Sequence, residues 1–204
     1  RISDGVTITI FGTFEASSAV LSSTGQGDRW SGLVMESPYS NLLLDGTTLL
    51  EASPSIMFGG GNLAVDGGTI SRSASSRALI EVNEQVGGSF SLSNMRLTDG
   101  SSSCIDIIES TIQLHISNAD FYACNGPSIR AENANVVIDD IVIGEGSSDG
   151  FVLSSIIGTI ENVDALEFNG AGNIFKLDYI NNDLAISNIV GTVAVSYTHL
   201  TLPT

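Results

Sequence analysis

The sequence predicts an all-β protein, a parallel β-helix (solenoid) of about seven coils with roughly 24 residues in each. Two columns of apolar residues and one column of turn-forming residues recur along the chain with this shared period, which is typical of a repeat fold. One coil cannot bury its inward side chains alone, so the coils must stack. We expect their strands to pair in parallel at about 4.8 Å per coil.

The first column belongs to a short alternating strand that ends at a bend, as in the segment from Leu114 to Phe121. Its aligned apolar residue recurs at Leu44, Val65, Leu92, Ile116, Ile138, Ile160 and Ile186. The position two residues earlier is apolar in every copy except one, where Gly158 stands. The position two residues later holds only residue types that tolerate a left-handed backbone, namely Gly46, Gly67, Asn94, Asn118, Asp140, Asn162 and Asn188. We therefore expect a left-handed corner in each coil.

The second column consists of two apolar residues that flank one variable position. Its first members are Leu33, Ile56, Ile80, Ile105, Ile129, Phe151 and Phe175. A third short strand is expected just after the bend, at Leu49, Ile70, Leu97, Phe121 and Ile143. Because independent columns keep one period and alternate within each copy, a chance match does not explain them.

The first coil is expected to begin with a strand and a turn between Gly5 and Ala16, followed by a second strand over residues 19–22. Trp30 stands between a polar loop and a strand. An exposed indole stacks well on a sugar, but we favour a Trp30 that closes the end of the core.

The charge composition limits the kinds of partner that this chain is expected to bind. The 204 residues include 23 acidic and 7 basic residues, for a net charge of −16. Such a charge repels phosphate, so no nucleic-acid partner is expected. No apolar run reaches the length of about 18 residues that a transmembrane helix needs, so none is predicted. The acidity is compatible with a secreted or surface protein and with Ca²⁺ binding.

The two cysteines, Cys104 and Cys124, fall on neighbouring coils but about four residues out of register. Four extended residues span roughly 13 Å, whereas a disulfide needs Cα atoms within about 7 Å. We therefore expect two free thiols, although a loop that folds back would permit the bond.

The columns, the Asn-rich bend and two short segments, Gly12 to Ala16 and Trp30 to Leu33, resemble the pectin-lyase-like superfamily of right-handed parallel β-helices. The resemblance covers residues 5–194 and implies the right-handed fold. It leaves the function open, because the superfamily includes polysaccharide lyases, glycoside hydrolases, adhesins and surface repeats.

The last ten residues, 195–204, resemble the in-frame translation of a transposase mosaic-end sequencing adaptor. We expect residues 1–194 to form a single parallel β-helix domain fragment that is open at both ends. Residues 195–204 are then a non-native tail, and we leave them out of the fold prediction.

An outward stripe in the second column is the first candidate site. Its charged members are Glu81, Asp106, Arg130 and Lys176. As a site, this stripe would hold an acidic sugar through its cations, or Ca²⁺ through its carboxylates. The alternative, which we favour, is a solvated face with one cross-strand ion pair between Asp106 and Arg130.

A second candidate is the pair Asp139 and Glu161, which are expected one coil apart just after the first column. Like charges at that distance repel unless a cation bridges them, so Ca²⁺ would explain the pair. Hydrated carboxylates on an exposed turn explain it equally well. No other cofactor is predicted.

An enzymatic function has weaker support. Asp139 and Asp140 invite comparison with the paired aspartates of polygalacturonases, but that family's glycine-flanked histidine and Arg-Ile-Lys element are absent from this sequence. His115 has no predicted catalytic partner, and Arg96 is expected to neutralise Asp120 on the next coil.

The sequence therefore favours a non-catalytic β-helix scaffold, secreted or at the cell surface, that serves adhesion or contacts a polysaccharide or cell-surface glycan. The alternative is a polysaccharide lyase or glycoside hydrolase of the pectin-lyase-like fold.

Overall fold

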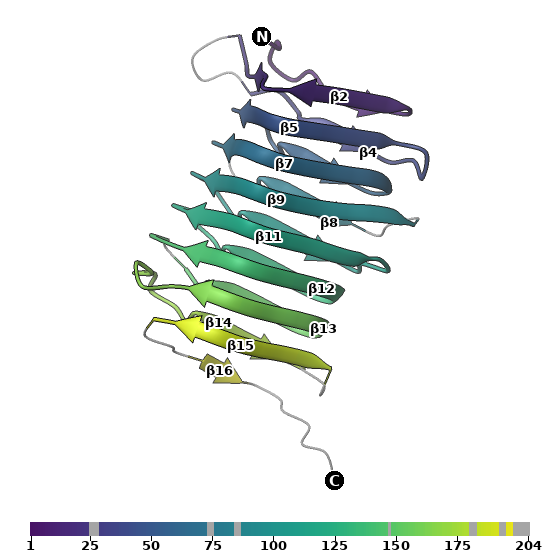
Figure 1. Cartoon of the computed structure of the whole chain (residues 1–204). Coiled ribbons are helices and arrows are strands. Elements are labelled where there is room, and N and C mark those ends of the chain that lie inside the picture. Colours follow the sequence, from purple (N-terminus) through teal and green to yellow (C-terminus); the bar gives the residue numbers. More distant parts are fainter. Residues whose placement is uncertain are drawn as a thin grey trace.

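The computed structural model describes residues 1–24, 29–72, 76–83, 87–146, 148–179, 183–191 and 195–197. Within these ranges the chain is all-β and forms one solenoid of about seven turns, which confirms the predicted fold class. In Figure 1 the near strands run from right to left and the far strands return from left to right as the chain descends. The coil is therefore right-handed. No helix that could span a membrane is found among the described residues.

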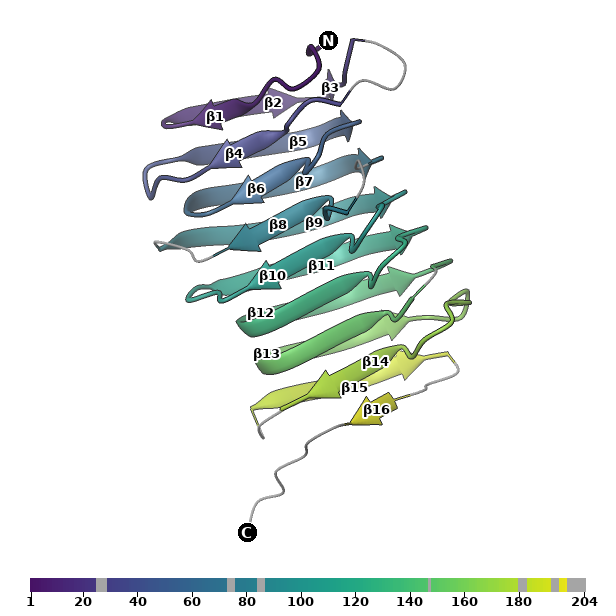
Figure 2. The same cartoon turned by 180° about the vertical axis from the view of Figure 1, so that it is seen from behind.

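Short strands form one face of the solenoid (Figure 2). They are β1 (Ile8–Ile10), β4 (Leu33–Met35), β6 (Ile56–Phe58), β8 (Ile80–Asn83), β10 (Ile105–Ile108), β14 (Phe175–Asp178) and β16 (Val195–Tyr197). Strands that are mostly longer cover the other sides (Figure 1), namely β2 (Thr13–Ser17), β5 (Asn41–Leu50), β7 (Gly61–Ser71), β9 (Gly88–Thr98), β11 (Gln113–Tyr122) and β15 (Leu184–Val190), together with the two-residue β3 (Val20–Leu21). Two strands, β12 (Ile129–Ile143) and β13 (Phe151–Asp164), continue around a corner and belong to both sets.

The columns predicted from the sequence match the residue pairing between neighbouring strands. The aligned residues of the first column pair from Leu44 to Ile186 without a slip, and those of the second column pair from Leu33 to Phe175. The third column also pairs, from Leu49 to Ile143. The structure also places a preceding coil in the first and second columns, where Ile8 pairs with Leu33 and Ala16 pairs with Leu44.

All seven residues of the bend column are left-handed, with φ between 47° at Asn118 and 73° at Gly67. The same corner in the first coil is formed by Ser18, at φ 50°. Gly158, the exception among the apolar positions, has φ 122°, and a Cβ there would lie 1.8 Å from the carbonyl oxygen of Val136. The backbones come too close at this point for any side chain.

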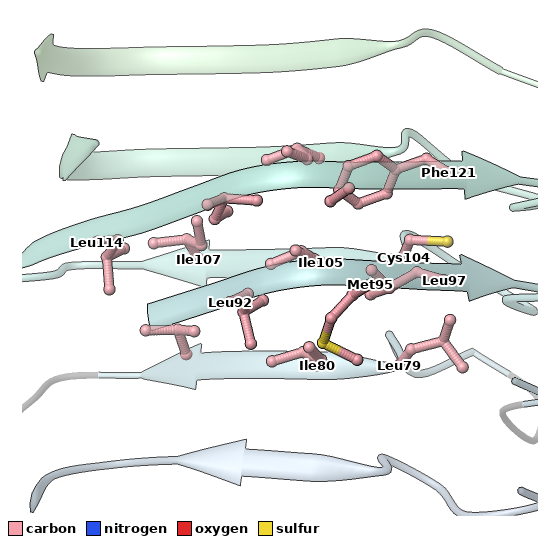
Figure 3. Close-up of a cluster of buried hydrophobic side chains, with 14 of the residues drawn as sticks. Leu79, Ile80, Leu92, Met95, Leu97, Cys104, Ile105, Ile107, Leu114 and Phe121 are labelled. Atoms are coloured by element: carbon pink, nitrogen blue, oxygen red, sulfur yellow. The ribbon is translucent and has the colours of Figure 1, made fainter. Parts of the chain in front are cut away.

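The core is a continuous stack of apolar side chains inside the coils (Figure 3). Side chains of the same type stack on one another along this core. The rings of Phe151 and Phe175, for example, lie parallel with their centroids 4.9 Å apart. Trp30 is fully buried, as expected, and its indole N–H donates to the carbonyl of Leu50 at 2.8 Å. Each added coil buries inward residues on its neighbours, so burial by stacking is the main stabilising effect.

The prediction of two free thiols is wrong, because Cys104 and Cys124 form a disulfide with Cα atoms 5.7 Å apart. The estimate of 13 Å assumed extended chain between the register positions. Instead the chain bends there: the amide of Asn125 donates to the carbonyl of Gly100 at 2.8 Å, and the amide of Gly126 donates to that of Ser102 at 2.9 Å. These turns bring the beginning and the end of one coil together.

The predicted tail falls partly within the described residues. Val195–Tyr197 forms β16, which pairs in parallel with β14. Residues 198–204, including His199, lie outside the described residues.

Candidate functional site

The charged stripe lies on the short-strand face, in one register column. Glu81, Asp106 and Arg130 are paired in sequence on β8, β10 and β12. Lys176 lies two coils beyond Arg130, because Val152 of β13 separates them. The register therefore brings three of the four predicted residues together and leaves Lys176 apart.

The carboxylates of this stripe are already occupied by arginines. Arg130 donates from Nε to Oδ1 of Asp106 at 2.8 Å and from Nη2 to Oδ2, which makes the predicted ion pair bidentate. Arg77, four residues before Glu81, binds that carboxylate in the same way, with Nε 2.9 Å from Oε1. Hydrogen bonds to the carboxylates raise the pKa of both guanidinium groups. Paired in this way, the groups contribute local order more than ligand-binding capacity.

The predicted calcium pair, Asp139 and Glu161, occupies adjacent coils on β12 and β13 as expected. Oδ1 of Asp139 accepts a hydrogen bond from the side-chain Nδ2 of Asn162 at 2.7 Å. Over the residues that the structure describes, no group of three or more His, Cys, Asp or Glu side chains gathers in a way that could hold a metal ion.

A ladder of side-chain amides, which was not predicted from the sequence, runs along the left-handed corner. Nδ2 of Asn118 donates to Oδ1 of Asn94 at 2.6 Å, and Nδ2 of Asn94 donates to Oδ1 of Asp66 at 2.5 Å. Asn188 donates to Asn162 at 3.0 Å farther along the same corner. The hydrogen bonds from Asn94 and then Ser93 lower the pKa of Asp66. The recurring Asn residues are visible in the sequence, but there they indicate only a left-handed backbone and not hydrogen bonds between coils.

Arg96 and Asp120 are register partners on β9 and β11, as expected. The Arg96 guanidinium lies over the ring of Tyr122, 4.5 Å from its centroid, so a cation–π contact engages this cation. His115 is exposed on β11 between Ser91 and Val137 of the neighbouring coils.

A groove of about 510 Å³ lies on the long-strand face at the N-terminal end. It is lined by Glu15, Ala16, Ser17, Leu43, Leu44, Asp45, Ala64 and Asp66, from β2, β5 and β7. The columns found in the sequence did not include β2, the strand that pairs with β5 beside Asp45. Without that coil, no groove was predictable.

Comparison with family models, with curated proteins and with solved structures finds no match.

Proposed function

We propose that this chain is a non-catalytic β-helix scaffold, secreted or held at a cell surface, that contacts glycans in adhesion. The observation that carries the proposal is the outward surface of the long strands, where amides, hydroxyls and carboxylates stand in columns one coil apart. A polyhydroxylated ligand needs such closely spaced donors and acceptors. The likeness to the pectin-lyase-like superfamily is part of the same proposal.

One outward column shows how these groups are held. Nδ2 of Asn62 donates to Oδ1 of Asn41 at 2.8 Å, and the hydroxyl of Ser89 donates to Oδ1 of Asn62 at 3.0 Å. Each side chain is thus oriented by the next before a ligand arrives. Groups ordered in advance lose less conformational entropy on binding, which favours affinity.

The disulfide supports the extracellular part of the proposal. Disulfides persist mainly in oxidising compartments, such as the cell exterior and the periplasm. Both sulfurs are buried and join the beginning and end of one coil, which suits a structural bond.

The alternative, a polysaccharide lyase or glycoside hydrolase, needs a free base or acid beside the substrate. Arg130 and Asp106 instead hold each other, and Glu81 is held by Arg77. The stripe therefore enters our proposal as a secondary glycan contact, through Lys176 and the exposed edge of the Arg130–Asp106 pair.

The test combines binding and turnover. The chain is applied to a panel of immobilised neutral, acidic and amino-sugar glycans, and binding to at least one class is expected. In parallel, uronic-acid polymers are incubated with and without Ca²⁺, and no unsaturated or reducing-end product is expected. Product formation that is lost in Arg130→Ala would establish the enzyme instead, and a panel without any binder would remove the glycan proposal.

A further inference from the structure

Two exposed aromatic side chains lie at one corner of the solenoid, in the turns that lead into β2 and β5. Phe11 is 72% exposed and Tyr39 is 80% exposed. Each stands two residues before a position of the Thr13–Asn41 register pair, and the amide of Asn41 donates to the carbonyl of Gly12 at 2.8 Å. The two residues therefore lie in turns at the same corner of adjacent coils. Figure 2 shows both turns at the same edge of the molecule.

The groove described above continues from this corner along the same strands. Leu43 lies at its centre, is 40% exposed, and pairs with Glu15 on one side and Ala64 on the other. The neighbouring outward column holds Asp45 opposite Asp66. Tyr39 precedes Leu43 by four residues, which span at most about 13 Å of chain. The aromatic corner and the groove thus form one elongated surface.

Within the part of the chain that the structure describes, the carboxylates around Leu43 have no cationic partner. No ion pair between described residues includes Glu15, Asp45 or Asp66. The carboxylate of Asp45 accepts a hydrogen bond from the hydroxyl of Ser17 at 3.1 Å, and the carboxylate of Asp66 accepts from Ser93 and Asn94. Like charges directly opposite each other on paired strands repel. A bound cation with an apolar body would relieve this repulsion while covering the leucine.

We infer that this surface binds an oligosaccharide of amino sugars with free ammonium groups. The inference rests on the proposed glycan-binding function and names the ligand class. Phe11 and Tyr39 would receive the apolar faces of the sugar rings, and the Asn41 and Asn62 amides would bind hydroxyls. The groove would take an ammonium group between Asp45 and Asp66. A uronic-acid polymer is disfavoured by the same carboxylates and by the net charge of −16.

The test is calorimetric titration of the whole chain with four probes: a glucosamine hexamer, its N-acetylated counterpart, a galacturonate hexamer and oligolysine. The glucosamine hexamer is expected to bind most tightly, and binding should weaken with added salt. N-acetylation removes the positive charge and keeps the ring, so it isolates the ammonium contribution. Equal binding of the acetylated hexamer would overturn the inference.

Two double variants separate the parts of the surface. Asp45→Asn/Asp66→Asn is expected to weaken glucosamine-hexamer binding about tenfold, because it removes two charge-assisted contacts. Glu109→Gln/Glu132→Gln, which removes two exposed carboxylates on adjacent coils elsewhere, should leave binding unchanged. Phe11→Ala/Tyr39→Ala should also weaken it, whereas Tyr179→Ala, at a distant exposed aromatic, should not. Circular dichroism confirms that each variant is folded.

The outcomes distinguish this inference from the proposed function. If another glycan class binds and the glucosamine hexamer does not, the inference fails and the scaffold proposal stands. If no glycan binds, both fail. If oligolysine binds as tightly as the hexamer and the aromatic variant has no effect, the occupant is a basic peptide and the inference is wrong.

Discussion

At the scale of single residues, the corner column shows how one residue type serves two purposes. Asn94 and Asn118 tolerate the left-handed backbone, and their side-chain amides also form hydrogen bonds between coils: Asn94 donates to Asp66 and accepts from Asn118. The ladder is interrupted at Asp140, whose carboxylate cannot donate a hydrogen bond. Asn162 donates to Asp139 instead.

Asp140→Asn is therefore expected to extend the ladder toward Asn118. An amide can donate where the carboxylate cannot, and Asn keeps the left-handed preference. We expect the free energy of unfolding in urea to rise by about 0.5 kcal/mol, at the low end for a hydrogen bond because the position is exposed. Glu132→Gln removes one charge outside the column and serves as the control. An equal gain in both variants would attribute the effect to charge alone.

Asp66 provides a second residue-scale prediction. Its carboxyl pKa lies below the ordinary value of 3.8, mainly because of the Asn94 hydrogen bond. A lowered pKa means that this interaction is present above the unfolded pKa and is lost as the pH falls through the folded value. Asn94→Gly keeps the corner and removes the donor, so the pKa should rise toward 3.8 in an NMR titration. Ser93→Ala should raise it less, and an unchanged pKa in Asn94→Gly would contradict this assignment.

At the scale of elements, strands pair so closely at some positions that the backbone determines the residue. Gly158 of β13 replaces an apolar residue because its Cα faces the carbonyl of Val136 on β12. The exception is visible in the sequence, but its cause is not, because the cause is a contact between coils.

Gly158→Ala is accordingly expected to lower the free energy of unfolding by about 3 kcal/mol or more, through both the steric contact and the positive φ. Gly12→Ala is the matched control, because a Cβ there meets no atom within 4 Å. Thermal denaturation compares the two variants. Similar melting temperatures would mean that the strands separate at little cost.

At the scale of the whole molecule, stability comes from each coil resting on the next. The disulfide closes a central coil, linking residues 20 apart in sequence. Neighbouring coils should transmit its effect only partly, because interactions in a solenoid are between nearest neighbours.

Cys104→Ala/Cys124→Ala should lower the free energy of unfolding by about 3 kcal/mol, from the loop-closure entropy of a loop of that length. Hydrogen exchange should accelerate most in β10 and β11 and least in the end coils. Reduction of the unmodified chain should reproduce the change. Two titratable thiols in the untreated, denatured protein would show that the bond does not form.

The sequence by itself determined the period, the inward columns and the left-handed bend, because these depend on which residue types recur at which spacing. It also identified the Asp106–Arg130 pair, since both lie in one column. Only the tertiary structure decided the Cys104–Cys124 bond and the groove around Leu43. It also revealed left-handed corners at residue types without that preference, namely Glu51, Arg72, Ala123 and Tyr179. The inward columns can be read from the sequence because buried positions recur at a fixed spacing along the chain. The shapes of the corners depend instead on backbone hydrogen bonds to the adjacent coil, such as the one from the amide of Ala123 to the carbonyl of Glu145.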